Sequence, residues 1–146
     1  MAITNDPAFS VYALSATFVC LHMIALDSIS GGVRGKSKTT PNKEDARDKG
    51  QVVASEPEAV ARVTRAHRNL FVNGVPFLVL GLVMVLLGTT KTTAMAYFGT
   101  FIVARVGHSV AYLAGKQPFR SIFFTIGQLA IIGIIYQIVR GALAGL

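Results

Sequence analysis

Long apolar runs alternate with short polar connections along the whole chain. The runs cover residues 8–26, 70–87, 94–113 and 122–139. A helix that crosses a membrane needs about 20 mostly apolar residues, and all four runs meet or approach that length. The strands of a membrane barrel would instead alternate apolar and polar positions, whereas these runs are continuous. The pattern therefore predicts four membrane-spanning helices.

The connections between the runs suggest where each helix begins and ends. Gly31 and Gly32 are suitable residues for ending the first helix. Ser55, with Glu58 three residues later, has the spacing of a capping box at the start of the second helix. We expect one all-α domain over residues 1–146, an integral membrane four-helix bundle. Its helices are expected at 8–30, 56–88, 92–115 and 118–143, with a long loop at 34–54.

Composition supports the membrane assignment. The chain is 52% hydrophobic and 14% charged, whereas soluble domains carry about 25% charged residues. Its net charge is +7, and nine of the fourteen lysines and arginines lie between residues 34 and 68. A nucleic-acid-binding protein would also be basic but would not be this apolar, so we expect no nucleic-acid partner.

The position of the basic residues predicts the orientation in the membrane. Basic loops stay on the cytoplasmic side, so the 34–54 loop should be cytoplasmic and both termini should lie outside the cytoplasm. The expected location is the inner membrane in a bacterium or the endoplasmic reticulum in a eukaryote. Cys20 is the single cysteine, and no His, Asp or Glu set has metal-ligand spacing, so we expect no metal site.

Polar residues inside the apolar runs are the candidates for function. Arg105, His108 and Tyr112 are spaced i, i+3, i+7, which places them on one helix face. A charge in a membrane segment usually faces the bundle interior or a wet cavity. Two further sets share a face near the same membrane interface. These are Arg65, Arg68 and Asn69 on the second helix, and Arg120, Phe124 and Gln128 on the fourth.

Such a pocket suits a particular kind of ligand. Arginine side chains pair with carboxylates through two parallel hydrogen bonds, so several of them suit a small, multiply anionic molecule. Apolar flanks suit a lipophilic second substrate that arrives from the bilayer. Ser121, beside Arg120, would place a hydroxyl and a cation where they favour a thiolate, the reactive form of a thiol.

Structural interpretations of these residues remain open. Arg62, Arg65 and Arg68 have the positions of ordinary positive-inside anchors. Arg105 has a natural role as the partner of a carboxylate or a backbone carbonyl, and a lone histidine such as His108 is more often a buried hydrogen-bonding residue than a ligand.

Two stretches carry a family resemblance that extends over nearly the whole chain. They are "RVTRAHRN" at 62–69, followed by "PFL" at 76–78, and "RVGHSVAYLAGKQPFRS" at 105–121. They resemble the membrane-associated proteins in eicosanoid and glutathione metabolism, the MAPEG family, and most closely its microsomal prostaglandin E synthase branch. The resemblance implies a homotrimer of four-helix subunits that binds glutathione between neighbouring subunits near the cytoplasmic side.

The resemblance also implies roles for individual residues. It implies that Arg120 stabilises the glutathione thiolate, that Ser121 assists, and that Asp45 interacts with this arginine, while Arg105 is structural. The implied glutathione-binding residues are Arg34, supplied by the adjacent subunit, together with Arg65, Arg68, Asn69, His108, Tyr112, Phe124 and Gln128.

The sequence departs from the family pattern at two places. Val72 stands where the family usually has a glutamate that helps to hold the amino group of glutathione. Phe124 replaces a tyrosine of this branch, which keeps the ring and loses the hydroxyl. The first departure predicts weaker glutathione binding.

These features favour a glutathione-dependent membrane enzyme. It would conjugate glutathione to lipophilic electrophiles, reduce lipid hydroperoxides, or act as an isomerase of the prostaglandin E synthase type. The alternative is a non-catalytic lipid-binding protein of the same fold, which Val72 favours and the Arg120-Ser121 pair opposes. A proton-coupled transporter would rest on Arg105 and His108 alone, without paired acids in the helices.

Overall fold

The computed structural model describes residues 5–40, 42–46 and 50–145. Four long helices and two very short strands make up the fold. In chain order these are α1 (Pro7–Ser37), β1 (Thr39–Thr40), the 3-10 turn η2 (Lys43–Asp45), β2 (Gln51–Val52), α2 (Glu58–Leu86), α3 (Lys91–Leu113) and α4 (Gln117–Ala144).

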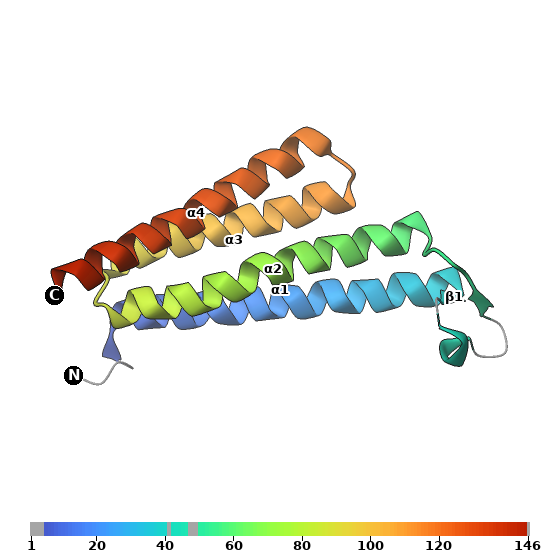
Figure 1. The fold of residues 1–146 in the computed structure, drawn as a ribbon, viewed down its shortest axis with the longest axis horizontal. Helices are drawn as coiled ribbons and strands as arrows, with labels where there is room; N and C mark the ends of the chain where they lie inside the picture. Colours follow the sequence, from blue (N-terminus) through green and yellow to red (C-terminus); the bar gives the residue numbers. More distant parts are fainter. Residues whose placement is uncertain (1–4, 41, 47–49, 146) are drawn as a thin grey trace.

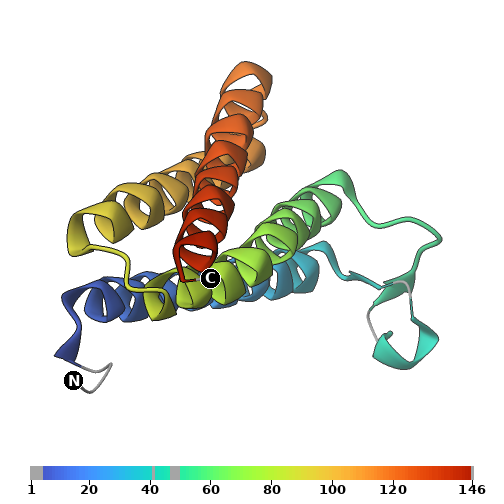
Figure 2. The same cartoon turned by 60° about the vertical axis from the view of Figure 1, so that its left-hand side comes forward.

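The helices form two antiparallel hairpins, α1 with α2 and α3 with α4 (Figure 1). Both termini and the α2–α3 turn lie at one end, which we call the terminal end. The α1–α2 connection and the α3–α4 turn lie at the other, the loop end. The hairpins lie close together at the terminal end and diverge towards the loop end in both views (Figure 2). The chain is an integral membrane protein with the predicted four-helix architecture.

Three helices, α1, α2 and α4, are long and apolar enough to cross a membrane. Helix α3 has 23 residues, about 35 Å at 1.5 Å per residue, which is also long enough. Its mean hydropathy is lowered by Arg105 and His108, whose side chains are buried in the bundle. The interior of the protein, and not the lipid, therefore surrounds these two polar groups.

The expected end of the first helix is wrong. Helix α1 continues through Gly31 and Gly32 to Ser37, so the predicted loop begins after residue 37 and Arg34 belongs to the last turns of α1. Nothing lies within 4 Å of a side chain added at either glycine, so no close approach forces the helix to stop there. Lys38 ends the helix instead, in the left-handed conformation with φ 52°.

The start of α2 also differs from the expectation. Pro57 precedes the first helical residue and no side chain caps the helix, so Ser55 is not the cap. The carboxylate of Glu58 is engaged elsewhere, because it accepts hydrogen bonds from Arg62 and Arg65. The connection between α1 and α2 is held by β1 and β2, which pair in parallel.

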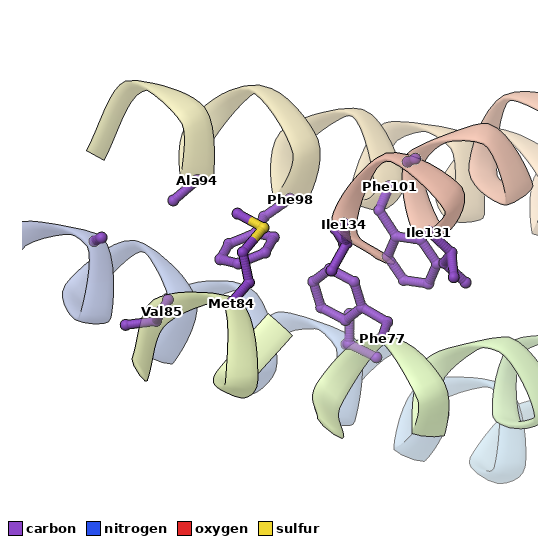
Figure 3. Close-up of a cluster of buried hydrophobic side chains, with 11 residues drawn as sticks. Phe77, Met84, Val85, Ala94, Phe98, Phe101, Ile131 and Ile134 are labelled. Carbon is purple, nitrogen blue, oxygen red and sulfur yellow. The ribbon is translucent and has the colours of Figure 1, made fainter. Parts of the chain in front are cut away.

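The apolar core fills the half of the bundle nearer the terminal end. The rings of Phe77 and Phe101 stack with centroids 4.1 Å apart, and Phe98 meets Phe77 edge to face at 5.4 Å. Ile131 and Ile134 of α4 pack beside these rings (Figure 3). Between helices in a membrane, van der Waals packing of this kind is a main source of association. This core fixes the hairpins relative to each other and leaves the loop-end half for polar groups.

Candidate functional site

Arg105 is the most deeply buried charge of the loop-end half, with 1% of its surface exposed. Its Nη1 donates to Oδ1 of Asn69 on α2 over 3.5 Å. Its guanidinium carbon lies 5.1 Å from the ring centroid of Phe101 and 5.5 Å from that of Phe124. The sequence suggested a carboxylate or a backbone carbonyl as partner. The structure provides an amide oxygen and two aromatic faces, which attract a cation through their quadrupoles.

The lack of a side chain at Gly127 of α4 leaves room for the guanidinium of Arg105. A Cβ at this position would lie 2.8 Å from Cζ and Nε of Arg105, closer than non-bonded atoms approach. The side chain of Arg105 therefore rests directly on the α4 backbone. Nε and Nη2 are buried and have no hydrogen-bond partner within the described part of the chain.

His108 connects α3 to the first turns of α4. Its Nδ1 lies 3.0 Å from the carbonyl oxygen of Arg120. Because a carbonyl only accepts, Nδ1 carries a proton and donates it, and in the neutral ring this leaves Nε2 as an acceptor. Nε2 is buried without a partner among residues 5–40, 42–46 and 50–145. The ring also lies near Tyr112 and Phe124, at centroid distances of 5.6 and 5.8 Å.

Tyr112 is close to two guanidinium groups. The Cζ atom of Arg120 is 4.7 Å from the centroid of the Tyr112 ring. The Tyr112 hydroxyl lies near the guanidinium of Arg65 on α2. One aromatic side chain of α3 is therefore close to cations contributed by α4 and α2.

Glu58 is a member of the site that sequence reasoning assigned only to capping. Its Oε1 accepts from Nη2 of Arg65 at 2.8 Å and from Nη2 of Arg62 at 3.1 Å. The i, i+4 and i, i+7 spacings were the available signal for these pairs. Arg62 also reaches the α3–α4 turn, where its Nη1 would lie 2.7 Å from a Cβ at Gly115. Gly115 also has φ 69°, a conformation that favours glycine. Both the contact with Arg62 and the backbone conformation therefore favour glycine here.

Six of the expected site residues form one group, which we call the Arg120 cluster. Its members, linked by the contacts above and, for Asn69, through Arg105, are Arg65, Asn69, His108, Tyr112, Arg120 and Phe124. Arg68 and Ser121 are exposed and Gln128 is half-buried. No hydrogen bond or ion pair joins these three side chains to another described residue.

Arg34 and Asp45 lie apart from the Arg120 cluster. Both line an open pocket of about 410 Å³ between the end of α1 and the connection to α2. Arg34 forms an ion pair with Glu56, and Asp45 accepts from Nδ2 of Asn42 at 3.0 Å. The described part of the chain shows no interaction between Asp45 and Arg120.

Comparison with known proteins identifies the family. The sequence profile of the MAPEG family matches residues 12–140. The chain belongs to the MAPEG family. It is 37% identical to human prostaglandin E synthase over 139 residues, which cover 93% of this chain and 91% of that protein. It is 31% identical to human microsomal glutathione S-transferase 1 over 147 residues, or 97% and 95% of the two chains. Membership confirms the resemblance found at 62–69 and 105–121.

No group of three or more His, Cys, Asp or Glu side chains that could hold a metal ion occurs in the described residues of this MAPEG protein. Its candidate site is instead built from guanidinium groups, aromatic rings and one imidazole. The guanidinium groups bind anions, the aromatic faces attract cations, and only the imidazole is a common metal ligand.

Proposed function

We propose that the protein is a glutathione-dependent membrane enzyme that uses the thiolate of glutathione on a lipophilic substrate. The observation that carries this proposal is the convergence of Arg65, Tyr112 and Arg120 from three helices, beside His108, in a MAPEG chain. The names of two relatives support it, because one is a glutathione transferase and the other a prostaglandin E synthase.

The residues fit the chemistry of the tripeptide. Glutathione carries two carboxylates, and the half-buried Arg120 and exposed Arg65 and Arg68 are cations suited to pair with them. The partnerless Nε2 of His108 is an acceptor that a ligand N–H could satisfy. The Phe124 ring offers an apolar face beside this atom.

Glutathione, when bound, supplies the thiol. Arg120 acts by its positive charge, which favours the ionised form and lowers the pKa of the thiol. Ser121 follows Arg120 at the start of α4 and donates a hydrogen bond to the same sulfur. The exposed apolar surfaces of the helices allow a lipophilic acceptor to approach from the bilayer. We propose conjugation to electrophiles or reduction of lipid hydroperoxides as the reactions.

We further propose that a neighbouring subunit completes the site in a homotrimer. Arg34 and Asp45 are at the loop end, as is the Arg120 cluster, yet they line a separate pocket. A second copy could bring its Arg34 to the cluster, and its Asp45 to Arg120. Native mass spectrometry in mild detergent should therefore detect trimers, and Arg34→Ala should weaken glutathione binding. Monomers or dimers alone would contradict this assembly.

The orientation is part of the same proposal. The basic residues of 34–68 favour a cytoplasmic loop end and hence a cytoplasmic active site. Both termini would lie outside the cytoplasm, with the protein in the inner membrane of a bacterium or the endoplasmic reticulum of a eukaryote. Reporter fusions at Gly145 and within the α1–α2 connection test this, and a cytoplasmic C-terminus would exclude it.

A second candidate function is non-catalytic lipid binding, and Val72 is the observation that favours it. This residue is 59% exposed on α2, four residues after Arg68. An apolar side chain there cannot hold the ammonium of glutathione. An isomerase of the prostaglandin E synthase type is a third possibility, supported by the relatives of that name.

One experiment separates enzyme from binder. Detergent-purified protein is mixed with glutathione, and the thiolate absorbance is recorded against pH, alongside turnover of a chlorinated nitroarene, a lipid hydroperoxide and a prostaglandin endoperoxide. A thiolate signal at neutral pH with turnover of either of the first two acceptors supports the transferase or peroxidase. Absence of both the signal and the turnover favours the lipid-binding protein. A thiolate signal with turnover of prostaglandin endoperoxide alone favours the isomerase.

A further inference from the structure

An apolar groove lies on the exposed side of the α3/α4 hairpin, and no member of the Arg120 cluster lines it. Its volume is about 320 Å³. The deep end lies at Gly107, against which the Phe123 ring packs, at 2.6–2.7 Å from a Cβ placed there. Val110, Ala114 and Phe119 form its walls, and Lys116 lies at its mouth in the α3–α4 turn.

The position of the groove along α3 places its mouth at the membrane surface. Gly107 is six residues before Leu113, the last residue of α3, about 9 Å along the helix axis at 1.5 Å per residue. The chain then turns back, and the N–H of Lys116 donates to the carbonyl of Ala111 at 2.9 Å, so Lys116 lies at the end of α3. Because α3 is about 35 Å long and the hydrocarbon core about 30 Å thick, this end lies at the level of the lipid headgroups.

The walls of the groove select its occupant. Apart from Lys116, every residue that lines it is apolar or a glycine. On a membrane-spanning hairpin such a surface faces the hydrocarbon core, so a single hydrocarbon chain is a suitable occupant.

The charge at the mouth selects the headgroup. Lys116 is exposed and takes part in no ion pair with any residue that the structure describes. A lysine near the membrane surface attracts anionic headgroups. A zwitterionic headgroup offers no net charge to this ammonium.

We propose that this groove is a binding site for an anionic phospholipid, with one acyl chain between Gly107 and Phe119 and the phosphate at Lys116. The site is separate from the Arg120 cluster and does not depend on glutathione chemistry. It would hold a lipid against the α3–α4 turn, to which Arg62 of α2 also packs.

The absence of tryptophan from the sequence allows a clean test. Phe119→Trp introduces one reporter in the groove wall, and Phe18→Trp introduces a control reporter on an exposed part of α1. Each full-length variant is reconstituted into vesicles that contain phosphatidylglycerol or phosphatidylcholine with brominated acyl chains. The ratio of quenching by the two lipids at one position cancels differences in depth.

We expect quenching at Phe119→Trp to show about fivefold preference for the anionic lipid, since one lysine near the surface contributes that much. The ratio should be close to one at Phe18→Trp. Adding Lys116→Gln should abolish the preference at Phe119→Trp, Lys116→Arg should retain it, and Lys91→Gln, at the opposite end of α3, should leave it unchanged.

Three outcomes would overturn the site. Equal quenching by both lipids at Phe119→Trp would mean ordinary boundary lipid without selection. No quenching by either lipid would mean that protein, such as a second copy of the chain, covers the groove. A preference that survives Lys116→Gln would mean that another group selects the headgroup.

Discussion

The two halves of the bundle have different interiors, one apolar and one polar, although the same four helices build both. In the half nearer the terminal end, large apolar side chains from α2, α3 and α4 meet face to face, as Phe77 and Phe101 do at 4.1 Å. In the loop-end half, Arg105 and His108 occupy interior positions with 1% and 4% exposure. Their buried nitrogens Nε, Nη2 and Nε2 lack partners among the described residues. Stability alone would not favour such an interior, since unpaired buried polar groups are costly.

Phe101 joins the two halves. Its ring stacks on Phe77 on the core side and lies 5.1 Å from the Arg105 guanidinium on the other. The core therefore supports the cation that in turn touches Phe124 and Asn69. This arrangement teaches that the apolar half acts as the rigid scaffold on which the polar half is held. Rigid support of this kind is what a functional site requires.

The largest effect should come from the core. Phe77→Ala removes a fully buried ring and should lower the free energy of unfolding by about 3–5 kcal/mol. Activity per folded molecule should fall by a smaller factor than in Arg120→Ala, because the Arg120 cluster keeps its own contacts and loses only the support that reaches it through Phe101. Reversible unfolding in mixed micelles measures the loss, and Phe71→Ala, exposed on the same helix, serves as the control. A loss of specific activity in the folded fraction as large as in Arg120→Ala would show that the core contributes directly to the site.

Arg120→Ala should produce the opposite result, with activity lost and stability kept. A hydrogen bond to a charged group contributes about 1.5–3 kcal/mol, so turnover at pH 7 should fall about ten- to a hundredfold. Removing the cation raises the pKa of the bound thiol, so activity should recover as pH rises. Thiolate absorbance against pH measures this. Arg140→Ala, at the terminal end of α4, is the matched control, and an unchanged thiol pKa in Arg120→Ala would refute the assigned role.

Val72→Glu should strengthen glutathione binding. A carboxylate at this exposed position of α2 would give the glutathione ammonium a charged partner. That interaction is also about 1.5–3 kcal/mol, or about ten- to a hundredfold in affinity. Val72→Gln, which is neutral and of the same size as the glutamate, should gain much less. Isothermal titration of both variants gives the comparison, and equal affinities in all three proteins would mean that the amino group is held elsewhere.

Two glycines of α4 allow the halves to be compared by one kind of substitution. A Cβ at Gly127 would meet Arg105, and a Cβ at Gly133 would meet the ring of Tyr97. Overpacking should destabilise both alanine variants by about 1–3 kcal/mol. Gly127→Ala should also reduce turnover per folded molecule, because it displaces the cation that lies against Phe124, whereas Gly133→Ala should not. Equal specific activities of the Gly127→Ala and Gly133→Ala variants would mean that Arg105 does not support the site.

The architecture was predictable because its signals are local and repeated. Four apolar runs give four helices, and the i, i+3, i+7 spacing of Arg105, His108 and Tyr112 gives a shared face. Burial of the first two was expected from the cost of exposing them to lipid. The sequence could not show that Arg105 rests on Gly127, since this contact depends on the packing of α3 against α4.

Weak or competing signals explain the errors. A glycine costs only about 1 kcal/mol within a helix, so Gly31 and Gly32 did not end α1, and Lys38 did. Glu58 has the spacing for a capping box and also for pairing with two arginines, and the arginines bind it. The separation of Arg34 and Asp45 from Arg120 depends on how the hairpins diverge, which no local pattern records.

Ser121→Ala should have the smallest effect of these substitutions. It should slow turnover and leave the free energy of unfolding unchanged. The side chain is exposed and makes no hydrogen bond to another described residue, so unfolding should be unaffected. A neutral donor contributes about 1 kcal/mol, which predicts about fivefold slower turnover and a slight rise in the pKa of the bound thiol. Ser28→Ala, exposed on α1, is the control. The ratio of the Ser121→Ala effect to the Arg120→Ala effect is the decisive quantity, because a charged donor stabilises a thiolate more than a neutral one. If Ser121→Ala slows turnover as much as Arg120→Ala, the hydroxyl and not the cation is the principal stabiliser at the loop end.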